Sequence, residues 1–326
     1  MGIGSTAWVS VLCLVSLAGA GCSYVGQSDS YAKALWHPSY QDAALVEAEQ
    51  AGAPAAHTAL TRLPPLDFPA AAEALEAQSR LARPRQRLSA AFCETKYKLW
   101  TDFGDYYAWP NVRDVLLGVA AGSVLANTSL DQDFRDWYQE DFRSPGTNNF
   151  SSFWRTFGEG AIFIPSFAGL GLAAAMCGDG PVANTVADFS FRTERAYAVG
   201  APALLFLQNG LGGSRPGENP HNSAWRPFQD DNGVSGHAFI GAVPFLTAAE
   251  MVDRPILKGG LYFCSALPAW SRVNDDMHYL SQACLGWWLA YLACRTVERT
   301  DCWERQISLV PIATAEMTGM GLVIER

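Results

Sequence analysis

At 326 residues, the chain is long enough to bury a large core, as one large domain or as a domain with appendages. Hydrophobic residues make up 49% of it and charged residues only 17%, which is typical of a helical protein that is deeply buried or lies at a membrane. The net charge of −9, without a basic face in the sequence, argues against nucleic acid as a partner.

The N-terminal residues have the pattern of an export signal. An apolar run at 7–20 is too short to span a bilayer comfortably, ends in small residues and is followed by Cys22. Small residues before a cysteine are typical of a bacterial lipoprotein processing site, although Gly19 stands where a leucine is usual and no basic residue precedes the run. We therefore predict a signal of lipoprotein type over residues 1–22 and a location at the bacterial cell envelope. A plain cleaved signal and an uncleaved anchor are the alternatives.

Residues 23–110 are predicted to form an irregular leader. The stretch 41–90 is rich in alanine and interrupted by prolines, so we expect a helix at 70–82 between breaks. Aromatic residues crowd the stretch 91–111, which could dock on the body of the protein or lie at a membrane interface.

Helical patterns dominate residues 111–298. Apolar segments separated by short loops predict an all-α bundle of about six core helices, most of them ~14–20 residues long. The expected segments are 111–126, 131–143, 153–177, 183–212, 235–252, 258–270 and 278–298. Their small, apolar residues suit close packing in water or in lipid. We expect a compact bundle held on a membrane by a lipid anchor or by apolar helices, with an integral bundle as the alternative.

The C-terminal tail, residues 299–326, has a different pattern. Residues 306–313 and 321–326 are rich in β-branched and apolar side chains and flank a short connecting segment. This pattern predicts a short C-terminal β-hairpin after the bundle.

Three polar islands interrupt the apolar sequence between Gln208 and Gln282. They are Gly213–Pro216, Val234–His237, and Ser271–Arg272 followed by His278. Arginine, histidine and serine are costly to bury beside apolar helices unless a partner or a ligand satisfies them. Their convergence would form a pocket for a phosphate-like oxyanion.

Each island offers groups suited to an anion. Arg215 and Arg272 carry planar guanidinium groups that match phosphate oxygens. Ser235 and Gly236 open a predicted helix, whose free N–H groups and dipole favour negative charge.

The two histidines suit the roles of general acid and nucleophile in a phosphoryl transfer. His237, in the first turn of a predicted helix, could protonate a leaving alkoxide. His278 also begins a helix, where the dipole favours the neutral imidazole that a nucleophile needs.

The three islands, in this order, resemble the type 2 phosphatidic acid phosphatase (PAP2) superfamily, which includes vanadium haloperoxidases. The family pattern is Lys, six residues, Arg-Pro; then Pro-Ser-Gly-His; then Ser-Arg, five residues, His, three residues, Asp. The matching positions are Arg215-Pro216, Ser235-Gly236-His237, Ser271-Arg272 and His278.

The resemblance implies an envelope phosphatase with its site on the extracytoplasmic side. His278 would form a phosphohistidine, His237 would act as general acid, and Arg215 and Arg272 would clamp the phosphate beside Ser235 and Gly236. The implied substrate is a phosphomonoester, a lipid phosphate or a lipid pyrophosphate. The scheme requires no metal and no cofactor.

The chain departs from the family pattern at three positions. The lysine is Gln208, the proline is Val234, and the aspartate that orients the nucleophilic histidine is Gln282. A glutamine can accept a hydrogen bond but supplies no charge, and Asp275 or Asp276 could take its place. Two alternatives follow: a catalytically impaired relative that binds phosphate or phospholipid, and a structural envelope lipoprotein.

Overall fold

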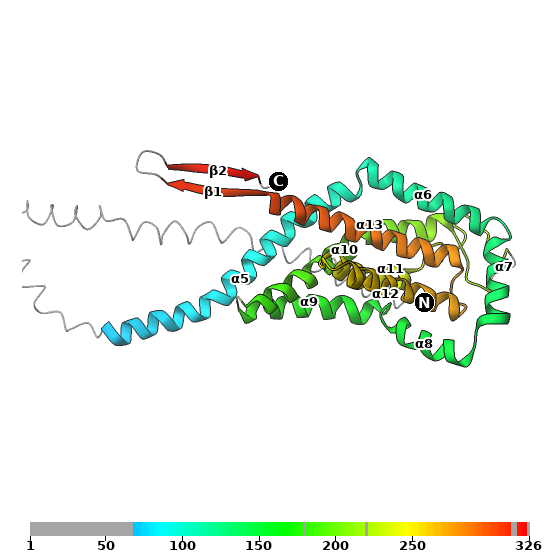
Figure 1. Ribbon diagram of the computed structural model, residues 1–326, viewed down its shortest axis with the longest axis horizontal. Helices are drawn as coiled ribbons and strands as arrows, with labels where there is room; N and C mark the ends of the chain where they lie inside the picture. The colour runs from blue at the N-terminus through cyan, green and yellow to red at the C-terminus, as the bar shows by residue number, and fades with distance from the viewer. Residues whose placement is uncertain (1–67, 179, 219–220, 314–317, 325–326) are drawn as a thin grey trace, which may run out of the picture.

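The computed structural model describes residues 68–178, 180–218, 221–313 and 318–324. The predicted signal and lipoprotein cysteine, and the first half of the predicted leader, residues 23–67, lie outside these residues. The described chain is helical apart from a two-stranded sheet at its C-terminal end (Figure 1).

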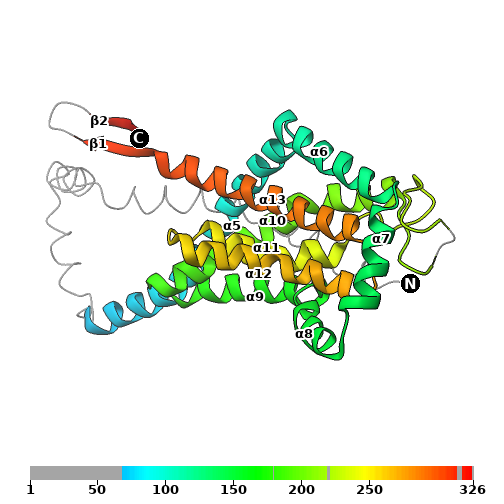
Figure 2. The ribbon, with the colours of Figure 1, turned by 45° about the vertical axis from the view of Figure 1, so that its right-hand side comes forward.

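Most of the helices follow one another with short connections, but a long loop, residues 212–235, joins α10 to α11. The helices are α5 (Phe68–Tyr106), α6 (Trp109–Ala126), α7 (Leu130–Trp137), the π-helical turn η1 (Tyr138–Phe142), α8 (Pro145–Thr156), α9 (Gly160–Cys177), α10 (Pro181–Leu211), α11 (Gly236–Glu250), α12 (Pro255–Asn274) and α13 (Leu280–Gln306). The predicted all-α bundle is confirmed. Both views show α9 to α13 running along the long axis, with α7 lying across one end (Figures 1 and 2).

Helix α11 forms the centre of the bundle. Ala238, Phe239, Ala242 and Val243 have no exposed surface, and the helix lies against α10, α12 and α13. A Cβ at Gly200 of α10 would lie 2.5 Å from the Phe239 ring, so the small residues of the sequence let these helices approach closely.

The N-terminal part of the described chain differs from the expected irregular leader. Helix α5 is 39 residues long and continues well beyond the helix expected at 70–82, through Pro84. Its end docks on the bundle: the Tyr107 hydroxyl just after it donates to the Val199 carbonyl (3.0 Å) and accepts from the Ala203 N–H (3.2 Å). Trp100 and Trp109 remain exposed.

The segment expected to be one helix at 153–177 is two helices. Helix α8 ends at Thr156, and α9 begins at Gly160. Ser144 caps α8 by accepting from the Thr147 N–H (3.2 Å), and Pro145 occupies its first turn. The start of α8 was not predicted from the sequence, although this Ser-Pro pair is a helix-start signal.

The predicted hairpin is present at the C-terminal end. Strands β1 (Ile307–Ala313) and β2 (Thr318–Ile324) pair antiparallel from Ile307↔Ile324 to Ala313↔Thr318. Helix α13 runs through position 298, where the predicted helical domain ends, and leads directly into β1. The division into leader, helical domain and tail stays a prediction.

Among the described helices, α9 is the one long and apolar enough to cross a membrane by length and composition. Only 17% of its residues are buried inside the bundle.

Candidate functional site

The three islands meet at the end of the bundle where α7 lies across it. The loop after α10 carries Arg215, α11 begins at Gly236, α12 ends at Asn274 and α13 begins at Leu280. The loop turns at Gly212, whose φ of +63° and whose closeness to the Arg226 carbonyl oxygen leave no room for a side chain. The structure therefore brings the predicted site residues to one place.

Gln282 holds the ring of His278 through a fixed amide. Its Oε1 lies 2.9 Å from His278 Nδ1 and accepts from the Tyr279 N–H (3.2 Å), while its Nε2 donates to the Ser214 carbonyl (2.8 Å). A backbone N–H can only donate and a carbonyl can only accept, so these two groups determine which amide atom faces the imidazole. His278 Nδ1 must then carry the proton, which leaves a lone pair on Nε2.

His278 is buried and neutral. Burial lowers its pKa to about 3, and the charges of Arg272 and Arg215 act in the same direction, against the hydrogen bond to Gln282. A neutral imidazole with a free Nε2 is the form that can attack phosphorus.

Arg272 is a buried cation with an unsatisfied donor. Its side chain is only 6% exposed, and its Nε makes no hydrogen bond within the described part of the chain. Burial lowers its pKa, although the nearby carboxylate of Asp275 opposes that effect. Such a group is strongly destabilising unless an anion completes it.

Arg215 lies at the more open side of the site. Its Nε donates to Asn232 Oδ1 (3.1 Å), and its guanidinium lies 3.9 Å from the Glu218 carboxylate. Both interactions leave donors of the guanidinium available to a ligand.

The second island forms the first turn of α11. The Ser235 hydroxyl accepts from the Ala238 N–H (3.3 Å) and so caps the helix. The Ser235 N–H donates to the Gln282 carbonyl (3.0 Å), which joins this turn to α13. Gly236 allows a close approach, since a Cβ there would lie 3.3 Å from Gln208 Nε2.

His237 follows in the same turn and faces an acidic group from another element. Its Nε2 lies 3.4 Å from Glu159 Oε1, just before α9. Burial and the charge of Arg272 lower the pKa of His237, and Glu159 acts in the opposite direction. This ring is partly exposed, so it can exchange protons with solvent.

Gln208 braces the turn instead of supplying charge. Its Nε2 donates to the carbonyl of Val234 (3.1 Å), the buried residue that stands in place of the family proline. The site therefore has no cation at this position.

The two aspartates considered as substitutes for Gln282 are engaged elsewhere. Asp276 forms a two-pronged ion pair with Arg135 of α7 (2.7 and 2.6 Å). Asp275 accepts from Ser151 of α8 (2.7 Å) and lies 3.4 Å from Arg155. Gln282 is thus the group that orients His278.

Two charged residues near the site were not predicted from the sequence. Arg155 and Glu159 lie at the junction of α8 and α9, which was expected to lie within one continuous helix. The glycines that flank Glu159 were the available signal, because Gly158 and Gly160 interrupt the helical pattern.

Comparison with known proteins agrees with the sequence resemblance. Residues 195–301, which include the three islands, match the family model of the PAP2 superfamily. A similar solved structure is a transmembrane PAP2-type phosphatidylglycerolphosphate phosphatase from Bacillus subtilis, with 18% identity, 58% of this chain and 94% of that chain covered, and a TM-score of 0.45. No curated protein matches the chain.

Proposed function

We propose that the protein, whose residues 195–301 match the family model of the PAP2 superfamily, is a phosphatase that hydrolyses a phosphate ester through a phosphohistidine on His278. The observation that carries the proposal is the buried guanidinium of Arg272, whose Nε has no partner in the described chain, beside two histidines. A phosphoryl group would supply the missing acceptor and balance the buried charge.

The proposed reaction has two steps. His278 Nε2 attacks phosphorus, the bond to the leaving oxygen breaks, and His237 gives that oxygen its proton. A water molecule then attacks the phosphohistidine, His237 takes a proton from this water, and inorganic phosphate leaves. Arg215, Arg272 and the N–H groups at Gly236 would stabilise the charge on the equatorial oxygens.

A membrane-associated substrate suits the surface of the bundle. Large apolar side chains are exposed along α6, α9, α10 and α12, which is unusual for a protein surrounded by water. They include Leu116, Leu117, Ile162, Leu170, Phe206, Ile256 and Phe263. This surface supports a location at a membrane. From the sequence resemblance alone, we propose that the membrane belongs to the bacterial envelope and that the site faces the extracytoplasmic side.

An apolar pocket is lined in part by residues that neighbour the site residues in the sequence. This pocket favours a lipid phosphate as the substrate. A cavity of about 300 Å³ lies between η1, α12 and α13, and Val273 and Leu280 form part of its wall. Val273 follows Arg272, and Leu280 lies two residues after His278. We propose that this cavity receives the apolar part of the substrate.

Gln208 and Gln282 favour one alternative, a relative that binds phosphate or phospholipid without turnover. The site lacks the family lysine, and Gln282 orients His278 without supporting its positive charge. Activity therefore separates the two proposals, whereas binding of phosphate is common to both.

The test uses the full chain in detergent. We expect hydrolysis of a generic phosphomonoester and of phosphatidic acid, and a loss of at least about 10³-fold in His278→Ala. The matched control is His221→Ala, which removes an exposed loop histidine and should retain activity. A chain that shows no turnover, but that inorganic phosphate or orthovanadate protects from thermal unfolding, would support the binding-only alternative.

A further inference from the structure

The junction of α8 and α9 covers the first turn of α11. A Cβ at Gly158 would lie 2.8 Å from His237 Cβ and 2.9 Å from the His237 carbonyl oxygen. The backbone of the junction therefore rests directly on the second island. Arg155 and Glu159 lie at the two ends of this short segment.

Helix α8 is also fixed to the turn of α12 that carries Arg272. The buried Ser151 hydroxyl bridges the Ser271 carbonyl (3.2 Å) and the Asp275 carboxylate (2.7 Å). Arg155 lies four residues after Ser151 and thus on the same face of α8. Its guanidinium is held over the C-terminal end of α12, next to the site.

Arg155 is only loosely held there. Its contact with Asp275 Oδ2 is 3.4 Å, longer than the 2.7–2.9 Å typical of a charge-assisted hydrogen bond, and its side chain is 50% exposed. The other oxygen of Asp275 is bonded to Ser151, so this carboxylate keeps a partner if Arg155 moves. The positive charge of Arg155 already lowers the pKa of Arg272, after the larger effect of burial.

Carboxylates outnumber the two arginines at the site, so a further cation would improve its charge balance. Arg215 and Arg272 face the carboxylates of Glu159, Glu218 and Asp275, and Gln208 adds no charge. A phosphate ester that carries about −2 charge would raise the excess of negative charge further. A third arginine would offset it.

We propose that Arg155 is a phosphate-binding residue, supplied by α8 in place of the lysine absent at Gln208. Its guanidinium lies 3.4 Å from Asp275 Oδ2, and we propose that it donates to a phosphate oxygen of the bound ligand. This inference rests on the proposed function of the same site and adds a residue that lies outside the three islands.

The first experiment measures binding of inorganic phosphate and orthovanadate to the full chain in detergent by calorimetry. We expect Arg155→Ala to weaken binding about 10-fold, as loss of a charge-assisted hydrogen bond would, and Arg155→Lys to recover part of that loss. The matched control, Arg143→Ala, removes an exposed arginine just before α8 that is hydrogen-bonded to Gln139 and Asn148. It should change affinity less than twofold.

A second pair of variants separates binding from a purely structural effect. If Arg155 acts only by holding Asp275, Asp275→Asn will weaken phosphate binding as much as Arg155→Ala does, and the inference is overturned. If Arg155 binds phosphate, Asp275→Asn releases it, and binding stays equal or tightens. Gln208→Lys combined with Arg155→Ala should then restore affinity.

The outcomes also distinguish this inference from the function on which it rests. Phosphate binding that Arg272→Ala abolishes and Arg155→Ala leaves unchanged would overturn the role of Arg155 and keep the proposed site. A wild-type chain that binds neither anion would overturn both.

Discussion

Gln282 performs one of the two tasks that a carboxylate would perform beside His278. Its amide is oriented by Tyr279 and Ser214, so it accepts from His278 Nδ1 and leaves Nε2 free. It supplies no negative charge to stabilise the imidazole as it becomes positive during attack. In the catalytic triad of serine proteases, changing the aspartate to asparagine costs about 10⁴ in rate, because the histidine then adopts the wrong tautomer. Here the tautomer is retained.

We therefore predict that Gln282→Asp raises the rate of hydrolysis. A charged hydrogen bond contributes about 1 kcal/mol more than a neutral one, which corresponds to roughly 5- to 10-fold in kcat. The measurement is kcat for a phosphomonoester, together with the melting temperature of each variant.

Gln282→Glu is the informative companion. It keeps the side-chain length, but it places a carboxylate oxygen against the Ser214 carbonyl, which now accepts from Nε2. We expect this variant to be less stable than Gln282→Asp. Equal rates in the wild type and in a folded Gln282→Asp variant would show that charge beside His278 does not limit the reaction.

The two histidines predict activity on the acidic side of neutrality. His278 is neutral above about pH 3, since burial lowers its pKa to about 3, whereas His237 must hold a proton to act as the acid. Burial also lowers the pKa of His237 below its usual 6.5, so kcat/KM should fall as the pH rises through a pKa below 6.5. A bound phosphate favours protonated His237, so the corresponding limb of kcat should lie at higher pH than that of kcat/KM.

The variant Glu159→Gln tests whether His237 is the group whose titration makes kcat/KM fall as the pH rises. The carboxylate of Glu159 raises the pKa of His237, so its removal should move the falling limb of kcat/KM to lower pH. The ionisation of the substrate is the same for both proteins and cancels in the comparison. A limb that stays in place would show that His237 is not the group that titrates.

The sequence was enough to predict which residues form the candidate site, but not which groups surround them. Arg215, His237, Arg272 and His278 stood out because such side chains are expensive to bury, and the structure brings them together. The partners of Gln282 could not be predicted, because they are backbone groups of Tyr279 and Ser214. The catalytic and binding roles of these residues stay predictions.

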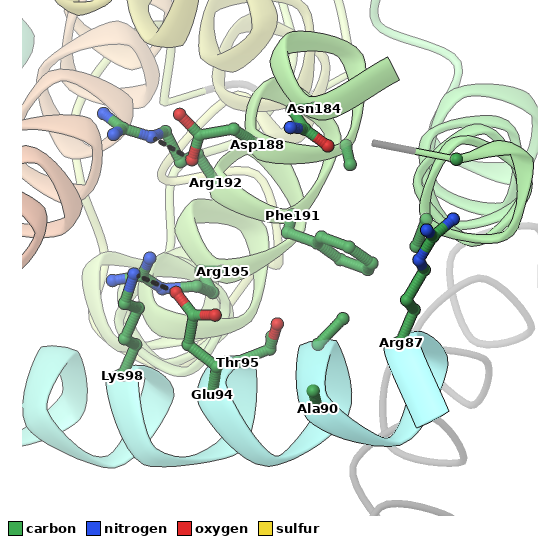
Figure 3. Close-up of a pocket in the computed structure, with 14 residues that line it drawn as sticks. Arg87, Ala90, Glu94, Thr95, Lys98, Asn184, Asp188, Phe191, Arg192 and Arg195 are labelled. Carbon is green, nitrogen blue, oxygen red and sulfur yellow. Dashed lines mark hydrogen bonds and ion pairs between the residues drawn. The ribbon is translucent and has the colours of Figure 1, made fainter. Parts of the chain in front are cut away.

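At the scale of elements, α5 is joined to the bundle by a buried ionic network. Arg195 of α10 donates to Asp102 of α5 (2.7 and 2.9 Å) and to Asp301 of α13 (2.9 and 3.2 Å). Arg192 pairs with Asp188, Glu298 and Asp301 in the same region. Beside it, a cavity of about 400 Å³ opens between α5, α9 and α10 (Figure 3). The network fixes three helices that are far apart in sequence.

We predict that Arg195→Ala destabilises the protein strongly. It leaves the fully buried Asp102 without its cation, and breaking a buried pair in this way typically costs about 3–5 kcal/mol. The measurement is the free energy of unfolding by chemical denaturant. Arg113→Ala removes an exposed arginine paired with Asp114 and should change stability by less than about 1 kcal/mol. A similarly small effect at Arg195 would show that α5 is held by other contacts.

The elements were predictable where a periodic pattern was uninterrupted. Helices α6, α10 and α11 begin and end close to their predicted limits. Helix α5 was underestimated because its prolines suggested breaks, whereas contacts distant in sequence, such as Arg195 with Asp102, stabilise it. The break between α8 and α9 was missed because apolar residues continue on both sides of it. Local patterns carry no information about such tertiary contacts.

In the whole molecule, the candidate site lies at one end of the bundle. The candidate site occupies the end where α7 lies, while the N-terminal part of α5 and the hairpin extend beyond the opposite end (Figures 1 and 2). Exposed apolar side chains lie along the helices between these ends, and others lie on α7, η1 and α8 at the end that holds the site. This arrangement suits a protein held in or on a membrane with its site at one face.

The proposed mechanism requires that His278 becomes phosphorylated during turnover. The most direct measurement is to incubate the full chain in detergent with a phosphomonoester labelled in its phosphoryl group, quench rapidly with denaturant at alkaline pH, and identify the labelled residue by mass spectrometry. We predict an acid-labile phosphohistidine at His278 that is absent from His278→Ala and present in His221→Ala. Turnover by the wild type without label on His278, or with label on another residue, would rule out a phosphohistidine at His278.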